Sequence, residues 1–119
     1  MRDDLTSAHL KYLLAIYEIS RESPDVSSAS IARKLGISKP SVSTMLTALM
    51  NRHLLVRERY SKVYLTDEGF LITKRLNDNL HALETALKKM PIQVSDEEAH
   101  RMASLIVTEI PEKDFVLEE

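Results

Sequence analysis

The feature that most constrains the fold is a pair of short amphipathic patterns separated by one glycine, SSASIARKLGISKPSVSTMLTALMNR, over residues 27–52. We expect the first helix to begin at Ser27 or Ser28 and to end at Gly36, because glycine tolerates the left-handed backbone found at helix ends. Ser38 can cap the next helix, and Pro40 suits a first turn, where its missing amide hydrogen would be unbonded anyway. Two short helices joined by a tight glycine-containing turn are typical of a helix-turn-helix.

The second of these helices, which should extend to about Arg52, has an apolar face and a hydroxyl-rich face. We expect the apolar positions to face inward; they are Val42, Met45, Leu46, Leu49 and Leu54. The opposite positions are Lys39, Ser41, Ser43, Thr44 and Thr47. Short hydroxyls reach phosphates and base edges, where they can donate or accept hydrogen bonds. This pattern favours a helix that contacts duplex DNA; the alternative is a capped polar helix face without a ligand.

The next segment, LLVRERYSKVYLTDEG, alternates apolar and charged residues and predicts a two-stranded hairpin with RYSK at its tip. On such a wing, Arg57, Arg59 and Lys62 would contact the sugar-phosphate backbone and add salt-dependent affinity. The alternative is an edge strand that carries charges to deter pairing with other strands. Seven bases face one acid from Val26 to Lys62, whereas six bases face twelve acids from Val63 onward. This asymmetry is expected of a DNA-binding part joined to a partner-binding part.

The remaining segments predict three more helices, so the fold class should be mainly α. Residues 7–21 have amphipathic spacing, and residues 66–90 predict a helix of about 24 residues, with Pro91 as its stop. Ser95 followed by DEE should begin a last helix that extends to about Glu109. Its expected apolar stripe consists of Ala99, Met102, Ala103, Leu105, Ile106 and Ile110.

We therefore predict a winged helix-turn-helix DNA-binding domain over residues 1–66 and a helical dimerisation and effector region over residues 67–119. The apolar stripes of the last two helices point to pairing with a second copy of the chain. The alternative is that these helices form an intramolecular hairpin that packs on the first helix.

Composition excludes several other classes of protein. The sequence has no cysteine, so it forms neither disulfides nor thiolate metal sites, which suits a reducing cytoplasm. Its apolar runs are too short for a membrane span, and its acidic N-terminus is unlike a secretory signal. We therefore expect a cytoplasmic protein. With no phosphate loop and no nucleophile–base pair, it is not expected to be an enzyme.

The order of these segments resembles the diphtheria-toxin-repressor and manganese-transport-regulator (DtxR/MntR) family of metal-dependent repressors over about residues 7–110. The resemblance rests on YLLAIYEI, IARKLGISKPSVS, YLTDEG and SDEEAHR. It implies a homodimeric DNA-binding regulator, of a short form without a C-terminal SH3-like domain. It places Ser38, Pro40 and Thr44 at base-facing positions, and Ser41 and Ser43 at phosphate contacts. The full set of predicted DNA contacts is Ser38, Lys39, Pro40, Ser41, Ser43, Thr44, Arg57, Arg59 and Lys62.

The resemblance also implies regulatory metal sites on the first, long and last helices, but most of their ligand positions are changed. The changed positions are Lys11, Leu14, Leu80, Ala103 and Ser104, whereas Glu84 and His100 retain coordinating side chains. A lysine adds positive charge where a cation site needs negative charge, so we expect the usual site to be absent. A different site could form from two pairs three residues apart, His81 with Glu84 and Glu97 with His100. That set would suit manganese, iron or zinc; the alternative is a solvated acidic face.

The sequence thus predicts a repressor that binds a pseudo-palindromic operator as a homodimer in response to a divalent transition metal. One alternative keeps the fold but responds to a small molecule or to no ligand, as in MarR-like winged-helix regulators. Another uses the winged helix for protein contacts, together with the acidic tail PEKDFVLEE. His9 and His53 have no partner pattern and are expected at a surface or an interface.

Overall fold

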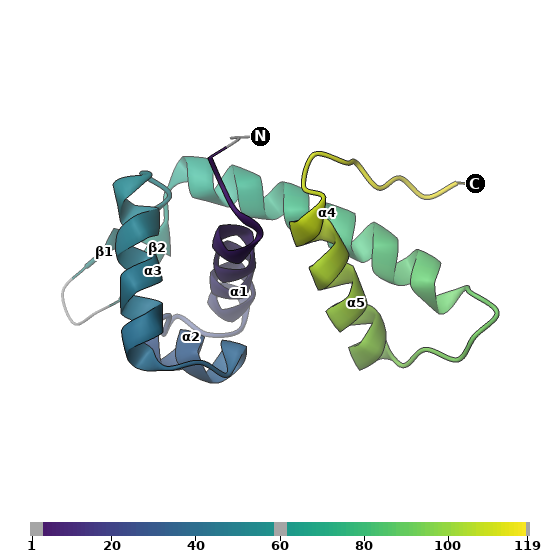
Figure 1. The fold of residues 1–119 in the computed structure, drawn as a ribbon, viewed down its shortest axis with the longest axis horizontal. Helices are drawn as coiled ribbons and strands as arrows, with labels where there is room; N and C mark the ends of the chain where they lie inside the picture. Colours follow the sequence, from purple (N-terminus) through teal and green to yellow (C-terminus); the bar gives the residue numbers. More distant parts are fainter. Residues whose placement is uncertain (1–3, 59–61, 119) are drawn as a thin grey trace.

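The computed structural model describes residues 4–58 and 62–118, which form five helices and one short hairpin. The elements are α1 (Ser7–Glu22), α2 (Ser28–Leu35), α3 (Lys39–Asn51), β1 (Leu55–Arg57), β2 (Val63–Leu65), α4 (Asp67–Lys88) and α5 (Asp96–Glu109). The first three helices and the hairpin gather at one end, while α4 extends along the molecule and α5 packs against its far half (Figure 1). The mainly α, winged helix-turn-helix fold class is confirmed.

Hydroxyl side chains begin all five helices. Each accepts a hydrogen bond from the backbone N–H three residues further on, which satisfies a donor that the helix itself leaves unpaired. These capping residues are Thr6, Ser27, Ser38, Thr66 and Ser95. At the other end of α2, Gly36 adopts the expected left-handed conformation, with φ of 67°. The predicted helix-turn-helix boundaries are therefore confirmed to within a residue.

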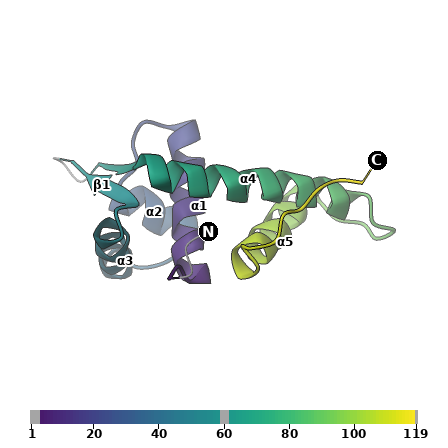
Figure 2. The ribbon, with the colours of Figure 1, turned by 90° about the horizontal axis from the view of Figure 1, so that it is seen from above.

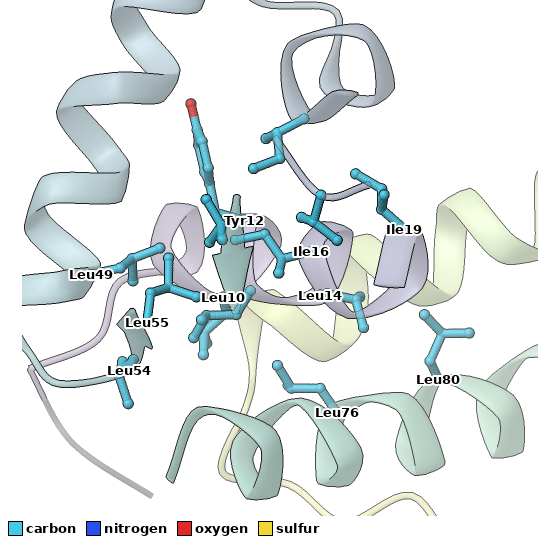
Figure 3. Packing of buried hydrophobic residues seen from close by; sticks show 14 of the residues in the cluster. Leu10, Tyr12, Leu14, Ile16, Ile19, Leu49, Leu54, Leu55, Leu76 and Leu80 are labelled. Atoms are coloured by element: carbon cyan, nitrogen blue, oxygen red, sulfur yellow. The ribbon is translucent and has the colours of Figure 1, made fainter. Parts of the chain in front are cut away.

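The core of the winged lobe lies between α1 and the helix-turn-helix (Figure 3). Three of the inward positions predicted for α3 and the following Leu54 are completely buried, whereas Met45 is half-buried. The hairpin is antiparallel, with Leu55 opposite Leu65. The N–H of Val63 donates to the carbonyl of Val26 at 3.0 Å, which attaches the second strand to the loop before α2. Together these contacts hold the wing beside α3.

Helix α4 runs straight from the winged lobe to the opposite end of the molecule, as Figure 2 shows. Its first turn packs so closely on the chain after α3 that a Cβ atom at Gly69 would collide with the carbonyl oxygen of Leu54. Further along, Leu76 and Leu80 are completely buried in the same cluster as the core of α1. Leu87, near the far end, joins this cluster with α5. One continuous core therefore crosses the boundary predicted at residue 66.

The face of α5 that packs against the molecule differs from the predicted stripe. Its buried residues are Ala99, Ala103, Val107 and Thr108. Three predicted members are exposed: Met102 at 37%, Leu105 at 57% and Ile110 at 37%. The predicted Ala99 and Ala103 are confirmed as buried, since helices that approach closely need small side chains between them, whereas Val107 and Thr108 were not predicted.

Two further expectations concern His9 and membrane association. The expected surface position of His9 is wrong: its side chain is buried, and its Nδ1 atom accepts a hydrogen bond from the N–H of Thr6 at 3.0 Å. This bond completes a capping box at the start of α1, with histidine in the place usually taken by Glu or Gln. His53 is exposed, as expected. Within the described part of the chain, no helix combines the length and apolar character that crossing a membrane requires.

Candidate functional site

The outer face of α3 carries a compact set of small polar side chains. Its inner face is held by Val42, Leu46 and Leu49, all completely buried, so the orientation of the helix in the lobe is fixed. Of the residues predicted to contact DNA from this segment, Ser43 is half-buried and the others are exposed: Ser38, Lys39, Pro40, Ser41 and Thr44. The structure therefore brings these six residues together on and around the first turns of α3.

The hydroxyl groups of Ser38, Ser41 and Thr44 are already bonded within the helix and its cap. Thr44 Oγ1 donates to the carbonyl of Pro40 at 3.1 Å, and Ser38 Oγ and Ser41 Oγ lie 2.9 Å apart. A hydroxyl has one donor and two acceptor positions, so a threonine bonded in this way still presents lone pairs to solvent. Without moving, Thr44 can accept from a base amino group; after rotation about χ1 it can donate to a phosphate or a base acceptor.

The wing contributes basic side chains beside this face. Arg57 is exposed, and its Nη2 atom donates to Ser28 Oγ at 3.0 Å, which links the first strand to the start of α2. Lys62 is half-buried just before the second strand. Arg59 lies outside the described residues. The guanidinium of Arg57 is thus held at the base of the wing by the start of α2.

A second group of polar residues joins three helices on the other side of α1. His100 of α5 contacts two carboxylates: its Nε2 atom lies 2.9 Å from Glu18 Oε2, and its Nδ1 atom lies 3.2 Å from Glu84 Oε1. His81 approaches the same oxygen of Glu84 at 3.7 Å. Three of the four predicted metal ligands therefore converge. The fourth, Glu97, is exposed and takes no part in the contacts seen among the described residues.

Glu18 is a member of this group that the sequence analysis missed. It lies one helical turn after Leu14, which occupies a ligand position of the resembled family, and so it projects on the same side of α1. The four-residue spacing from Leu14 could have predicted that Glu18 belongs to this group. Because the two ring nitrogens of His100 face different carboxylates, the group forms a bridge between helices, and its oxygen atoms do not surround one common point.

The comparisons with known proteins agree with this architecture. The family model described as "Iron dependent repressor, N-terminal DNA binding domain" matches residues 4–63. The chain belongs to the iron-dependent repressor family. The resemblance inferred from the sequence motifs is thereby confirmed, and α1, the helix-turn-helix and the start of the wing form the DNA-binding domain of this family.

The solved structures that are similar to the chain include two metal-dependent regulators and one hypothetical protein. The manganese regulator SloR is 26% identical with a TM-score of 0.69, over 82% of this chain and 45% of that chain. The metal-dependent transcriptional regulator MtsR is 24% identical with a TM-score of 0.72, over 86% of this chain and 47% of that chain. The hypothetical protein SSo2273 from Sulfolobus solfataricus is 20% identical with a TM-score of 0.58, over 97% of this chain and 81% of that chain.

These matches are limited in the length that they cover and in sequence identity. The chain spans just under half the length of the two regulators. At their levels of identity, MtsR and SSo2273 show a shared fold only. No curated protein sequence matches the chain.

The residues present do not fit the cation site that the iron-dependent repressor family implies. In α1 the changed positions hold an exposed lysine, Lys11, and a buried leucine, Leu14. In α4 and α5 they hold buried Leu80 and Ala103. Among residues 4–58 and 62–118, no group of three or more acidic or histidine side chains is arranged to hold a metal ion. The surviving pair, Glu84 and His100, is engaged in the bridge to α1.

Proposed function

We propose that this protein is a transcriptional repressor that binds a pseudo-palindromic operator as a homodimer, with one α3 in each major groove. The observation that carries the proposal is the exposed hydroxyl face of α3 on a lobe whose core fixes the orientation of the helix. Membership of a family of DNA-binding repressors supports it. Two half-sites would then lie about 34 Å apart, or a multiple of that distance, along the duplex.

Within this complex we assign different roles to the two kinds of polar residue. Ser38, Pro40 and Thr44 lie at the opening of α3, the part of a recognition helix that approaches base edges. The remaining predicted contacts would hold the sugar-phosphate backbone: Lys39, Ser41, Ser43, Arg57, Arg59 and Lys62. The first group sets sequence preference, and the second sets affinity and its dependence on salt.

The homodimer is supported by apolar side chains left exposed on α4, on α5 and on the loop between them. They include Leu71 at 66%, Ile92 at 57% and Met102 at 37%. Exposed apolar surface of this kind is typical of an interaction site, and two-fold pairing is the commonest way to cover it. We therefore assign dimer contacts to residues 67–119, and DNA contacts to residues 1–66.

Selection of bound duplexes from a random pool tests the proposal directly. It would be run in parallel with a chelator and with Mn²⁺ or Fe²⁺. We expect the same palindromic motif in both arms, because the family's cation ligands are replaced. A motif recovered only with metal would show that a metal site survives in another form, and His81, Glu84, Glu97 and His100 would be substituted next. Absence of a motif in both arms would contradict the proposal and favour a protein-contact role.

Two substitutions separate the assigned roles. Thr44→Ala should cost about 1 kcal/mol on the cognate duplex and relax preference at one position. Lys62→Ala should weaken binding to all sequences alike and reduce the salt slope by about one unit. A matched control is Thr85→Ala, since Thr85 is an exposed threonine on α4 with the same type of bond to the preceding turn. Equal losses on cognate and random DNA for both changes would overturn the assignment.

A further inference from the structure

A cleft of about 470 Å³ lies between α1, the end of α2 and α5. This volume falls within the range of small-molecule sites, about 300–1,000 Å³. Its walls include the apolar side chains of Leu14, Leu35 and Leu105. Leu105 is the most exposed apolar residue of α5, so the cleft accounts for part of the apolar surface that the helix does not bury in the protein.

Positive charge lines this cleft from all three helices. Lys11 comes from α1, Lys34 from α2 and Arg101 from α5, and all three side chains are exposed. The only carboxylate among the lining residues is Glu18, which is held by His100 at 2.9 Å. Among the ion pairs of the described residues, none involves Lys11, Lys34 or Arg101. The lining therefore presents three cations to solvent and one carboxylate that already has a partner.

The same cleft includes positions that the resemblance to metal-dependent repressors assigns to cation ligands. Lys11, Leu14 and Ser104 occupy such positions and line the cleft. Each replacement removes a donor for a divalent cation, and one of them introduces a positive charge. Together they turn a place suited to cations into one that repels cations and attracts anions.

We infer that this cleft binds a small organic anion with an apolar body, in place of a divalent cation. The anionic group would lie among Lys11, Lys34 and Arg101, and the apolar body would lie against Leu14 and Leu105. Because the cleft joins α1 and α2 of the DNA-binding lobe to α5, an occupant that prefers one arrangement of these helices would change operator affinity. That last consequence rests on the proposed function, whereas binding of the anion itself does not.

Binding can be measured without DNA by using a matched pair of fluorescent dyes. The anionic probe is 8-anilinonaphthalene-1-sulfonate, and N-phenyl-1-naphthylamine has the same aromatic body without the charge. We expect saturable binding of one sulfonate per chain, and binding of the neutral dye at least about tenfold weaker. Lys11→Gln or Lys34→Gln should weaken sulfonate binding about fivefold each, the upper range for an exposed ionic contact. The double variant Lys11→Glu, Lys34→Glu should weaken it at least about 25-fold.

The control is Lys74→Glu, Lys89→Glu, which makes the same change in net charge at two exposed lysines outside the cleft. It should leave sulfonate binding within about twofold of the original protein. Unfolding midpoints of all variants establish that they remain folded. Equal binding of the two dyes, or equal loss in the cleft and control variants, would overturn the inference. So would displacement of the sulfonate by Mn²⁺ in the original protein.

Operator affinity in the presence of the sulfonate then tests the regulatory consequence. We expect it to change at least about threefold in the original protein and in the control variant, and to stay constant in the Lys11→Glu, Lys34→Glu variant. A protein that binds the sulfonate but no operator would contradict the proposed function and leave the anion site standing. Operator binding without any sulfonate binding would contradict the anion site and leave the proposed function standing.

Discussion

The helices of the helix-turn-helix and of the α4–α5 pair all begin with a serine or threonine cap. The two regions differ in the hydrogen bonds and ion pairs that their polar side chains form. In α2 and α3, most of the bonded hydroxyls bond within their own helix or cap, as Thr44 does with Pro40, and Ser28 accepts from Arg57 of the wing. In the second half of the chain, charged groups cross between elements: Lys88 Nζ of α4 lies 2.9 Å from Asp96 Oδ1 of α5, and Arg75 Nη2 of α4 lies 2.7 Å from Asp114 Oδ1 in the segment after α5. Exposed pairs of this kind are screened by solvent and contribute little to stability.

This difference indicates how rigid each region is. A recognition face built on completely buried leucines keeps its shape whether or not DNA is present. The α4–α5 pair is also held by buried side chains, Leu87 and Val107 beside the small Ala99 and Ala103, and it adds polar bridges between helices at its surface. The hydroxyl face of α3 is thus preorganised, whereas the contacts beside the cleft, such as those of His100 with Glu18 and Glu84, are polar bridges between helices that an occupant can rearrange.

The largest test of this comparison substitutes one leucine in each region. Leu46→Ala should lower the free energy of unfolding by about 2–5 kcal/mol, because Leu46 is completely buried and its removal leaves a cavity. Leu105→Ala should cost less than about 0.5 kcal/mol in the monomer, since that side chain is 57% exposed. Denaturant unfolding at low protein concentration measures both. Similar losses would show that the two regions are equally well packed.

The next test uses the only two glycines of the chain. Gly69→Ala should destabilise the protein by about 3 kcal/mol, because the new Cβ meets the Leu54 carbonyl and forces α4 away from the winged lobe. Gly36→Ala should cost only about 1 kcal/mol, from the left-handed conformation alone, since a Cβ there meets nothing within 4 Å. If the order of the two losses were reversed, α4 would not be docked as tightly as described.

A smaller effect is expected at the end of α3. His53 has φ of 60° and an exposed side chain, so glycine should fit this position without the steric cost. We expect His53→Gly to raise the free energy of unfolding by about 0.5–1 kcal/mol. Operator affinity should not change, because the buried face that orients α3 is untouched. A loss of affinity with unchanged stability would show that His53 itself contacts DNA.

The smallest effect concerns the histidine in the capping box of α1. Burial lowers the pKa of His9, nearby Arg52 lowers it further and Asp4 raises it in part. The unfolded chain therefore binds a proton more readily than the folded one, so stability should be complete above about pH 6.5 and decline as the pH falls below it. His9→Gln preserves the capping box without titrating. Its unfolding midpoint should depend less on pH between 7.5 and 5.5; an unchanged dependence would assign the effect to other groups.

Sequence reasoning succeeded where structure depends on neighbours along the chain. The caps at Ser27 and Ser38 and the break at Gly36 follow from local hydrogen bonding and backbone preference. It failed where structure depends on distant helices: the buried face of α5, the burial of His9 and the approach of Glu18 to His100. These outcomes depend on interhelical distances, which periodicity within one helix does not contain.

Because α4 is one unbroken helix, a small tilt at one of its ends becomes a large displacement at the other end. Its 22 residues span about 33 Å, and the contact of Gly69 with the chain after α3 forms one end of that span. Tilting such a rod by about 5° about that contact displaces its far end by about 3 Å. In a dimer joined through the far ends, the same tilt changes the spacing of the two α3 helices by several ångströms, comparable to the rise of one base pair. In such a dimer, a tilt that moves Leu76 and Leu80 by only about 1 Å within the shared core would therefore be enough to put both α3 helices out of register with their half-sites.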